Sequence, residues 1–154
     1  ILAEVQGLVT TTGFGNPRRT ATGYDYNRLN LILAVLEKRM GLYFSNLDTY
    51  LNIVGGMRLD EPAADLSVAM ALVSGLRDIP IDEKMIAFGE IGLSGEVRAV
   101  SHIEYRVKEA VRLGFTRIIL PKKNVSSRLK VPKNVELCGV SNIYEVLVYM
   151  YSKK

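Results

Sequence analysis

Segments with helical spacing of apolar residues alternate along this sequence with short segments rich in β-branched residues, and this order constrains the fold more than any other feature. Four segments carry apolar side chains three and four positions apart, which is typical of helices that bury one face. Strand-like segments bounded by Gly, Pro, Asn or Asp lie between them. We therefore expect an α/β (α+β) fold, with a mixed sheet packed with about four helices through hairpin and crossover connections.

The clearest predicted element is a helix that follows Asp25. Asp25 can cap its first turn, Gly41 suits its end, and the apolar residues between them have helical spacing. These apolar residues are Leu29, Ile32, Leu33, Leu36 and Met40. Upstream, we expect strands over Ile1–Thr12 and Arg19–Gly23, with the second pairing back on the first after the turn Gly13–Pro17.

The middle of the chain predicts a strand, a break and a second helix. The strand covers Thr49–Val54, Gly55-Gly56 forms the break, and Asp60-Glu61-Pro62 begins the helix, because proline is tolerated in a first turn. This helix is expected to bury Leu66, Ala69, Met70 and Val73.

The second half predicts further strands and two more helices. Met85–Ile91 and Glu96–Val100 indicate strands joined by the turn 92–95, and Ser101 with Glu104 fits a capping box for a helix that ends at Gly114. That helix is expected to bury Ile103, Val107, Ala110 and Val111. The remaining elements are a buried strand over Arg117–Leu120 stopped by Pro121, a polar stretch over Lys122–Asn134, a strand over Val135–Val140, and a final helix capped by Ser141.

The length of 154 residues, 48% of them hydrophobic and 23% charged, predicts a single compact domain over residues 1–154. The longest apolar runs, Leu31–Leu36 and Val68–Val73, are six residues each, whereas a membrane helix needs about 20. We expect no membrane partner. The single cysteine, Cys138, cannot form an internal disulfide, and no signal-peptide pattern opens the chain, so we expect a cytoplasmic protein.

Positive charge is concentrated at the C-terminal end. Residues 110–154 carry nine basic and two acidic side chains, against a net charge of +4 for the whole chain. A polyanionic partner and a solvated Lys-rich loop explain this run equally well. The basic residues are Arg112, Arg117, Lys122, Lys123, Arg128, Lys130, Lys133, Lys153 and Lys154.

Several common sites are not indicated by the sequence. No Gly-Lys pair occurs, so we expect no phosphate-binding loop, and Gly13-x-Gly15 is better explained by a turn. One histidine, His102, and one cysteine cannot make a closed zinc site. We expect His102 to be exposed and Cys138 to be buried. No Gly-x-Ser-x-Gly segment supports a Ser-His-Asp triad on His102.

Three long segments resemble a known family. They are Gly7–Leu29 (GLVTTTGFGNPRRTATGYDYNRL), Val54–Pro80 (VGGMRLDEPAADLSVAMALVSGLRDIP) and Phe88–Val100 (FGEIGLSGEVRAV). They are similar to the C-terminal Lon-protease-like domain of bacterial RadA (Sms) DNA-repair proteins, over about residues 1–125. The resemblance implies a fold of the ribosomal protein S5 domain 2-like type.

The resemblance also implies what lies outside this chain. In that family a zinc ribbon and a RecA-like ATPase core precede the domain, and a start at Ile1 without methionine is expected of a fragment of a longer protein. ATP, Mg and Zn are therefore expected only in those missing parts, and no cofactor in this domain. The implied partners are further copies of the domain in a ring expected to be a hexamer, DNA bound without regard to its sequence, and a RecA-type recombinase.

Lon-type peptidases use a Ser nucleophile in an Asp-Gly-Pro-Ser-Ala-Gly segment and a Lys base shortly after a Gly-Glu-x-x-Leu-x-Gly-x-Val hairpin. Here the first segment reads 60-DEPAAD-65, which puts Ala63 at the serine position. The hairpin 89-GEIGLSGEV-97 matches, and counting onward puts Glu104 at the lysine position. The resemblance thus implies a domain that has lost both halves of the dyad.

An active peptidase remains an alternative. Ser67 follows Ala63 by one helical turn and Lys108 follows Glu104 by one turn, so a displaced dyad is conceivable. Against this alternative, a shift of one turn moves each group about 5.4 Å along its helix, away from any oxyanion hole formed at the helix start.

The candidate DNA-binding residues are arginines near the first predicted helix. Arg18 and Arg19 follow a turn and Arg28 lies in the helix start, and the planar guanidinium suits phosphate. Ion pairs with Asp25 or Glu37 across a subunit interface explain them almost as well. Tyr24 and Tyr26 are candidates for stacking on bases, although packing is the commoner role of tyrosine. Lys122 and Lys123 are the alternative DNA contacts, on the outside of a ring.

The leading hypothesis is a non-catalytic scaffold and DNA-contacting domain of an ATP-dependent recombination and branch-migration protein. The alternatives are the displaced Ser67–Lys108 peptidase and a purely oligomerising scaffold without DNA contact.

Overall fold

The computed structural model of the chain describes residues 3–13, 15–55, 58–59 and 61–152. It consists of two compact units, Ile1–Glu61 with Ser67–Pro80, and Pro62–Leu66 with Ile81–Lys154. The chain therefore passes between the units twice within a few residues. Gly56 and Asp60, which the sequence places in a break and at a helix start, lie outside the described residues. The one-domain organisation stays a prediction.

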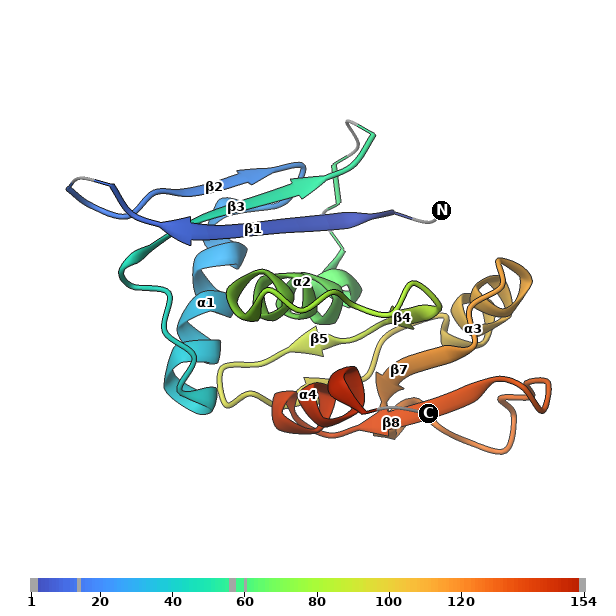
Figure 1. Cartoon of the computed structure of the whole chain (residues 1–154). Coiled ribbons are helices and arrows are strands. Elements are labelled where there is room, and N and C mark those ends of the chain that lie inside the picture. The colour runs from blue at the N-terminus through green and yellow to red at the C-terminus, as the bar shows by residue number, and fades with distance from the viewer. Residues whose placement is uncertain (1–2, 14, 56–57, 60, 153–154) are drawn as a thin grey trace. The chain divides into compact units, whose positions relative to one another are not determined.

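The described residues form four helices, two short 3-10 turns and eight strands, which confirms the predicted mixed α/β class (Figure 1). In chain order they are β1 (Val5–Thr11), β2 (Arg19–Thr22), α1 (Tyr26–Met40), β3 (Leu47–Ile53), η1 (Pro62–Ala64), α2 (Asp65–Arg77), β4 (Met85–Ala87), β5 (Glu90–Ile91), β6 (Val97–Arg98), α3 (Ile103–Arg112), β7 (Arg117–Pro121), η2 (Lys122–Asn124), β8 (Glu136–Val140) and α4 (Ile143–Tyr151). Among these described helices none is long and apolar enough to cross a membrane.

The sheet of the first unit has the order β1-β3-β2. β3 pairs antiparallel with β1 and parallel with β2. The prediction that β2 pairs back on β1 is therefore wrong. β3 takes the central position because Thr49, Leu51 and Ile53 are buried, whereas the four-residue β2 alternates half-buried with exposed residues and suits an edge.

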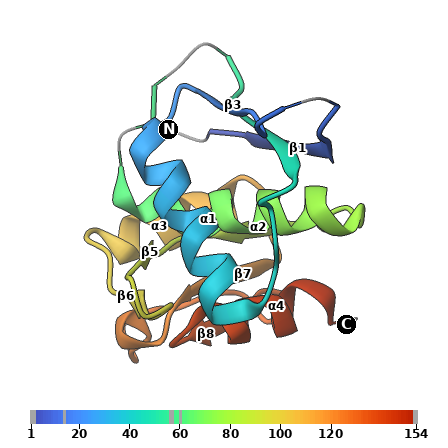
Figure 2. The ribbon, with the colours of Figure 1, turned by 90° about the vertical axis from the view of Figure 1, so that its left-hand side faces the viewer.

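Two helices cover one face of this sheet, as Figures 1 and 2 show from two directions. A Cβ atom on Gly7 would come 2.9 Å from the backbone oxygen of Ala71, so β1 approaches the backbone of α2 more closely than a side chain allows. α1 begins as predicted, because the Asp25 carboxylate accepts a hydrogen bond from the Asn27 N–H. It ends as predicted at Gly41, where φ is 67°.

The second unit contains a parallel sheet in the order β4-β7-β8 and a separate β5-β6 hairpin. All five residues of β7 are buried, as expected of a parallel strand covered on both faces. Ile118 and Leu120 of β7 pack with Val107 and Ala110 of α3 to form a core cluster. The buried residues of α2 and α3 agree with the sequence prediction, except that Ile103 and Val111 are half-buried.

The segment Met85–Ile91 forms two strands rather than the one predicted. β4 pairs with β7, and the Phe88 N–H still donates to the Ile119 oxygen of β7. β5 pairs with β6 after the chain leaves the parallel sheet at Gly89. The turn 92–95 is confirmed, because Gly92 donates to the backbone oxygen of Glu96 and Gly95 has a φ of 81°. The backbone of Gly89 pairs with η1 and the start of α2 instead of with a strand.

Both predicted serine caps in the second unit are wrong by one residue. α4 is capped by Asn142, whose side chain accepts from the Glu145 N–H, and the Glu145 carboxylate accepts in return from the Ser141 N–H. α3 is capped by His102, which has a φ of 59° and makes no side-chain cap bond. Ser101 instead offers its backbone oxygen to the guanidinium of Arg106.

A buried arginine anchors the end of α4. Arg117 is 4% exposed. Its guanidinium donates to the Tyr149 and Ser152 backbone oxygens and the Ser152 hydroxyl, and it pairs with Glu136 at 3.3 Å. In the sequence, Arg117 is one of the basic residues of the C-terminal excess. In the structure, its guanidinium is used for these internal bonds.

We predict that Arg117→Ala lowers the free energy of unfolding by about 1.5–3 kcal/mol, because the Tyr149 and Ser152 backbone oxygens lose a charged donor. Urea denaturation followed by circular dichroism measures this change. Arg112→Ala is the control, since it removes an exposed ion pair with Glu109 and should leave the midpoint nearly unchanged. Equal effects of the two substitutions would contradict a structural role for Arg117.

Candidate functional site: a degenerate dyad and a basic groove

Ala63 lies buried at the centre of η1, held by backbone hydrogen bonds. The Gly89 N–H donates to the Ala63 oxygen at 2.9 Å, and the Leu66 N–H donates to the Gly89 oxygen at 3.1 Å. The Asp65 carboxylate, which is also buried, accepts from the Ile91 N–H at 3.0 Å. The start of α2 is therefore fixed against β5, with a methyl group at Ala63, the position that the resemblance aligns with the serine.

Gly89 is required by this arrangement. A Cβ atom on Gly89 would lie 2.7 Å from Cδ1 of Leu66 and 3.0 Å from Cγ1 of Val97, closer than carbon atoms pack. The glycine that begins the family hairpin therefore serves the backbone approach. The same contacts hold the hairpin and the η1 turn together.

Glu104 lies exposed in the first turn of α3. The predicted capping box between Ser101 and Glu104 is wrong, because His102 takes the cap position in a left-handed conformation and no side chain caps the helix. Glu104 is thus a solvent-facing carboxylate rather than a cap. A carboxylate in this first turn is favoured by the helix dipole.

The two residues of the displaced dyad belong to different units. Ser67 lies half-buried in α2 in the first unit, and Lys108 lies exposed on α3 in the second. The displaced dyad stays a hypothesis.

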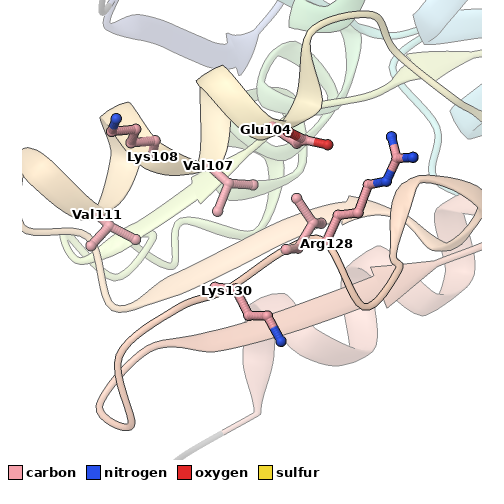
Figure 3. A pocket seen from close by; sticks show the side chains of 7 residues that line it. Glu104, Val107, Lys108, Val111, Arg128 and Lys130 are labelled. Carbon is pink, nitrogen blue, oxygen red and sulfur yellow. The ribbon is translucent and has the colours of Figure 1, made fainter.

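A cavity of about 330 Å³ lies between α3 and the segment that follows η2, and we call it the α3 groove. Figure 3 shows the α3 side chains on one wall and Arg128 and Lys130 on the other, with Val107 pointing between them. Its lining consists of Glu104, Val107, Lys108, Val111, Arg128, Leu129 and Lys130.

Sequence reasoning missed this groove. The helical stripe of Glu104, Val107, Lys108 and Val111 was visible as positions i, i+3, i+4 and i+7. Nothing in the sequence pairs that stripe with residues 128–130, because the opposite wall lacks regular secondary structure.

The structure holds Arg18 and Arg19 at the start of β2. The Asp48 carboxylate on β3 accepts from the Arg18 N–H at 2.7 Å and from the Thr12 hydroxyl at 3.1 Å, and the Arg18 oxygen accepts from the Thr49 N–H. The Arg18 side chain is exposed. Arg19 is half-buried and donates to the side-chain oxygen of Asn30 on α1, at 3.3 Å.

These bonds bring Arg19 close to the first turns of α1, where Arg28 lies two positions before Asn30, half-buried. Tyr24 is only 4% exposed and packs in the core, so it is not available for stacking. Tyr26 is 51% exposed. One of the two tyrosines is therefore accessible beside the arginines.

Lys122 and Lys123 lie exposed in η2, as a surface contact requires. The neighbouring Asn124 fixes the turn, because its side chain accepts from the Val100 N–H and donates to the Val100 oxygen. Lys153 and Lys154 lie outside the described residues.

The remaining candidates behave as expected. His102 is exposed, and Cys138 is fully buried in β8, where burial raises the pKa of its thiol to about 11. In the described part of the chain, no group of three or more His, Cys, Asp and Glu residues is placed to hold a metal ion.

Comparison with known sequences identifies the class of the domain. The family model for the Lon protease (S16) C-terminal proteolytic domain matches residues 37–152. Because this match covers most of the chain, the chain belongs to that family.

The chain is also similar in sequence to DNA repair proteins. The chain is 52% identical over 147 residues to the DNA repair protein RadA of Bacillus subtilis, covering 96% of the chain and 32% of that protein. It is 51% identical over 152 residues to DNA repair protein RadA of Streptococcus pneumoniae, covering 99% of the chain and 36% of that protein. The chain thus spans about a third of the length of these relatives.

We predict that the chain does not hydrolyse unfolded protein substrates and is not labelled by serine-directed phosphonates, because neither Ala63 nor Glu104 can act in a Ser-Lys dyad. Intact-mass spectrometry after phosphonate treatment, with an active Lon peptidase alongside, measures labelling. Labelling at Ser67 that disappears in Lys108→Ala would overturn this prediction in favour of the displaced dyad.

Proposed function

We propose that this chain is a non-catalytic Lon-like domain that assembles with further copies of itself and contacts DNA within a RadA-type DNA repair protein. The observation that carries the proposal is the buried methyl group of Ala63, held in a backbone arrangement that keeps the family hairpin but offers no nucleophile. A family scaffold that has lost its chemistry while its fold is intact is suited to binding.

The relatives support the repair role, since they are DNA repair proteins about three times as long as the chain. An ATP-driven branch-migration activity would belong to the rest of such a protein, together with ATP, Mg and Zn. This domain would need no cofactor. The whole protein would act in the cytoplasm, where a RecA-type recombinase is a possible partner.

The proposed DNA contact rests mainly on Arg18. Its backbone is tied to Asp48 and Thr49, while its exposed guanidinium makes no ion pair with any residue that the structure describes. Arg19 and Arg28 would add positive charge beside it. Contacts of this kind hold the phosphate backbone without reading sequence.

Self-assembly is the second part of the proposal. A closed ring uses heterologous contacts, in which one surface meets a different surface of the neighbouring copy. With six copies, as the family resemblance suggests, the arginines would face a common channel. A scaffold without DNA contact is the alternative that the salt dependence below separates from this proposal.

We predict concentration-dependent assembly in the absence of nucleotide, because the contacts must come from the domain's own side chains. Light scattering coupled to size exclusion, over low to high micromolar concentration, measures the mass. A six-subunit species is expected at the upper end. A strict monomer throughout that range would contradict self-assembly of the domain.

We predict that replacing Arg18 and Arg19 with alanine flattens the slope of log affinity against log salt by about one to two units, since each neutralised phosphate contributes about 0.7–0.9. Fluorescence anisotropy with two unrelated DNA sequences at several salt concentrations measures this slope. Both sequences should weaken equally.

Two control variants locate the contact. Lys38→Ala removes an exposed charge near the other end of α1, roughly 15 Å along the helix by its rise, and should leave the slope unchanged. If the pair Lys122→Ala with Lys123→Ala flattens the slope and the arginine pair does not, the DNA surface lies at η2. If neither pair has an effect, the domain is a scaffold without DNA contact.

A further inference from the structure

The α3 groove combines an apolar floor with a rim of unpaired positive charge. Val107, Val111 and Leu129 supply the floor, and all three pack on the core of the second unit. Lys108, Arg128 and Lys130 supply three cations against the single carboxylate of Glu104. Such a lining suits an apolar side chain with acidic neighbours.

Several arginines of the second unit form ion pairs with nearby carboxylates. Arg98 pairs with Glu90 and Glu96, Arg112 with Glu109, and Arg117 with Glu136. By contrast, Lys108, Arg128 and Lys130 form no ion pair with any described residue. The three cations around the groove therefore outnumber its one carboxylate, Glu104, and form no direct ion pair among the described residues.

The groove wall is shaped before any ligand arrives. The Leu129 N–H donates to the Ser126 oxygen at 3.1 Å, and the Arg128 N–H donates to the Ser126 hydroxyl at 3.2 Å. Asn124 ties the start of the same stretch to Val100. Preorganisation of this kind lowers the entropy cost of binding.

The size and chemistry of the groove favour peptide over nucleic acid. A volume of about 330 Å³ is at the lower end for ligand pockets and accepts one large aliphatic side chain with its flanking backbone. None of the seven described lining residues is aromatic, so the groove offers no stacking platform for bases.

The chain itself carries a segment with the complementary chemistry. Residues 78–83 read Asp-Ile-Pro-Ile-Asp-Glu and connect α2 with β4. Asp78, Asp82 and Glu83 are exposed, and Ile79 is 44% exposed although it is aliphatic. Three acids around an exposed isoleucine match three cations around an apolar floor, and Lys84 directly afterwards offers a partner for Glu104.

The exposure of Ile79 is fixed by the local backbone. Its N–H and its oxygen both bond to Ser74, on the last turns of α2, and Asp78 has a φ of 56°. At the other end, the Asp82 carboxylate accepts from the Lys84 N–H at 2.8 Å. Each half of the segment therefore has its own local backbone bonds, residues 78–79 in the first unit and residues 82–84 in the second.

We propose that the α3 groove binds the 78–83 segment of a second copy of this chain, with Ile79 in the groove and the acidic side chains against Lys108, Arg128 and Lys130. This head-to-tail contact rests on the proposed self-assembly and names the two surfaces that make it. Because the two surfaces differ, each copy can bind one neighbour with its groove and another with its segment.

The test is a charge exchange between the two surfaces. The groove variant carries Arg128→Glu with Lys130→Glu, and the segment variant carries Asp82→Asn with Glu83→Lys. The asparagine keeps an oxygen for the Lys84 N–H. Each variant alone should weaken self-association at least about tenfold, because like charges then face each other. An equimolar mixture of the two should regain association, since each altered surface meets an oppositely charged one.

The matched control is Lys38→Glu with Lys133→Glu, which changes the net charge equally at exposed positions outside the groove lining. Sedimentation velocity should show association of this control close to that of the wild type. Ile79→Ser should weaken association without changing charge. Circular dichroism melting curves verify that every variant is folded.

Several outcomes overturn the proposal. If the groove variant associates like the wild type, or the mixture of variants does not recover, the groove is not the docking surface. If the groove variant lowers DNA affinity while self-association persists, the groove serves nucleic acid. If the wild type associates and the variants associate equally well, this contact is refuted but the proposed assembly is not. If the wild type is a monomer, the proposed assembly itself is refuted.

Discussion

The close approach at Gly89 is the constraint on which the second unit depends. Its N–H and oxygen bond to Ala63 and Leu66, and a side chain at this position would overlap Leu66 and Val97. This bonding takes Gly89 out of the parallel sheet, which separates β4 from β5 and lets the β5-β6 hairpin form. The same bonds fix the position of η1 and hence of Ala63. The side chain held at this position is a methyl group, which cannot act as a nucleophile.

Much of the fold could be predicted because it follows from local patterns. The first helix was bounded correctly by Asp25 and Gly41, since both caps act through bonds within a few residues. The buried faces of the helices followed from apolar spacing.

The pairing of β2 could not be predicted in this way, because a four-residue strand carries too little pattern to specify its neighbour, and β3 comes later in the chain. The serine caps failed for a related reason. Several residues that can cap adjoin each other at both helix starts, and tertiary bonds decide among them.

The candidate functional residues were likewise predictable only where the information was local in sequence. The absence of Ser and Lys at Ala63 and Glu104 was inferred from the sequence because the resemblance supplied aligned positions, and the loss of a catalytic dyad there stays a prediction. Arg18 is exposed, and its role as a DNA contact stays a prediction. The sequence did not reveal that Asp48 binds the Arg18 backbone or that Asn30 holds Arg19. Tyr24 shows why neighbours in sequence are not enough to identify a binding residue. Its position beside the arginines suggested stacking on bases, but its side chain is buried and cannot reach a ligand. The groove depends on two segments about 20 residues apart in sequence, and only folding brings them together.

The distribution of charge connects these observations. An excess of basic residues near the C-terminus has no single meaning, because the structure divides them into different roles. Arg117 is used internally to hold the end of α4, and Arg112 is neutralised by its helix neighbour Glu109. The cations that remain without carboxylate partners among the described residues include those on the rim of an apolar groove.

Holding like charges together in the free chain is unfavourable unless they are separated by solvent, and their repulsion is relieved when an acidic surface approaches. An arrangement of this kind contributes little to the stability of the isolated chain, but it favours association with a partner of opposite charge. The same reasoning explains why the acidic 78–83 segment, which forms its own local bonds and exposes Ile79, gains more from a second copy than from its own fold.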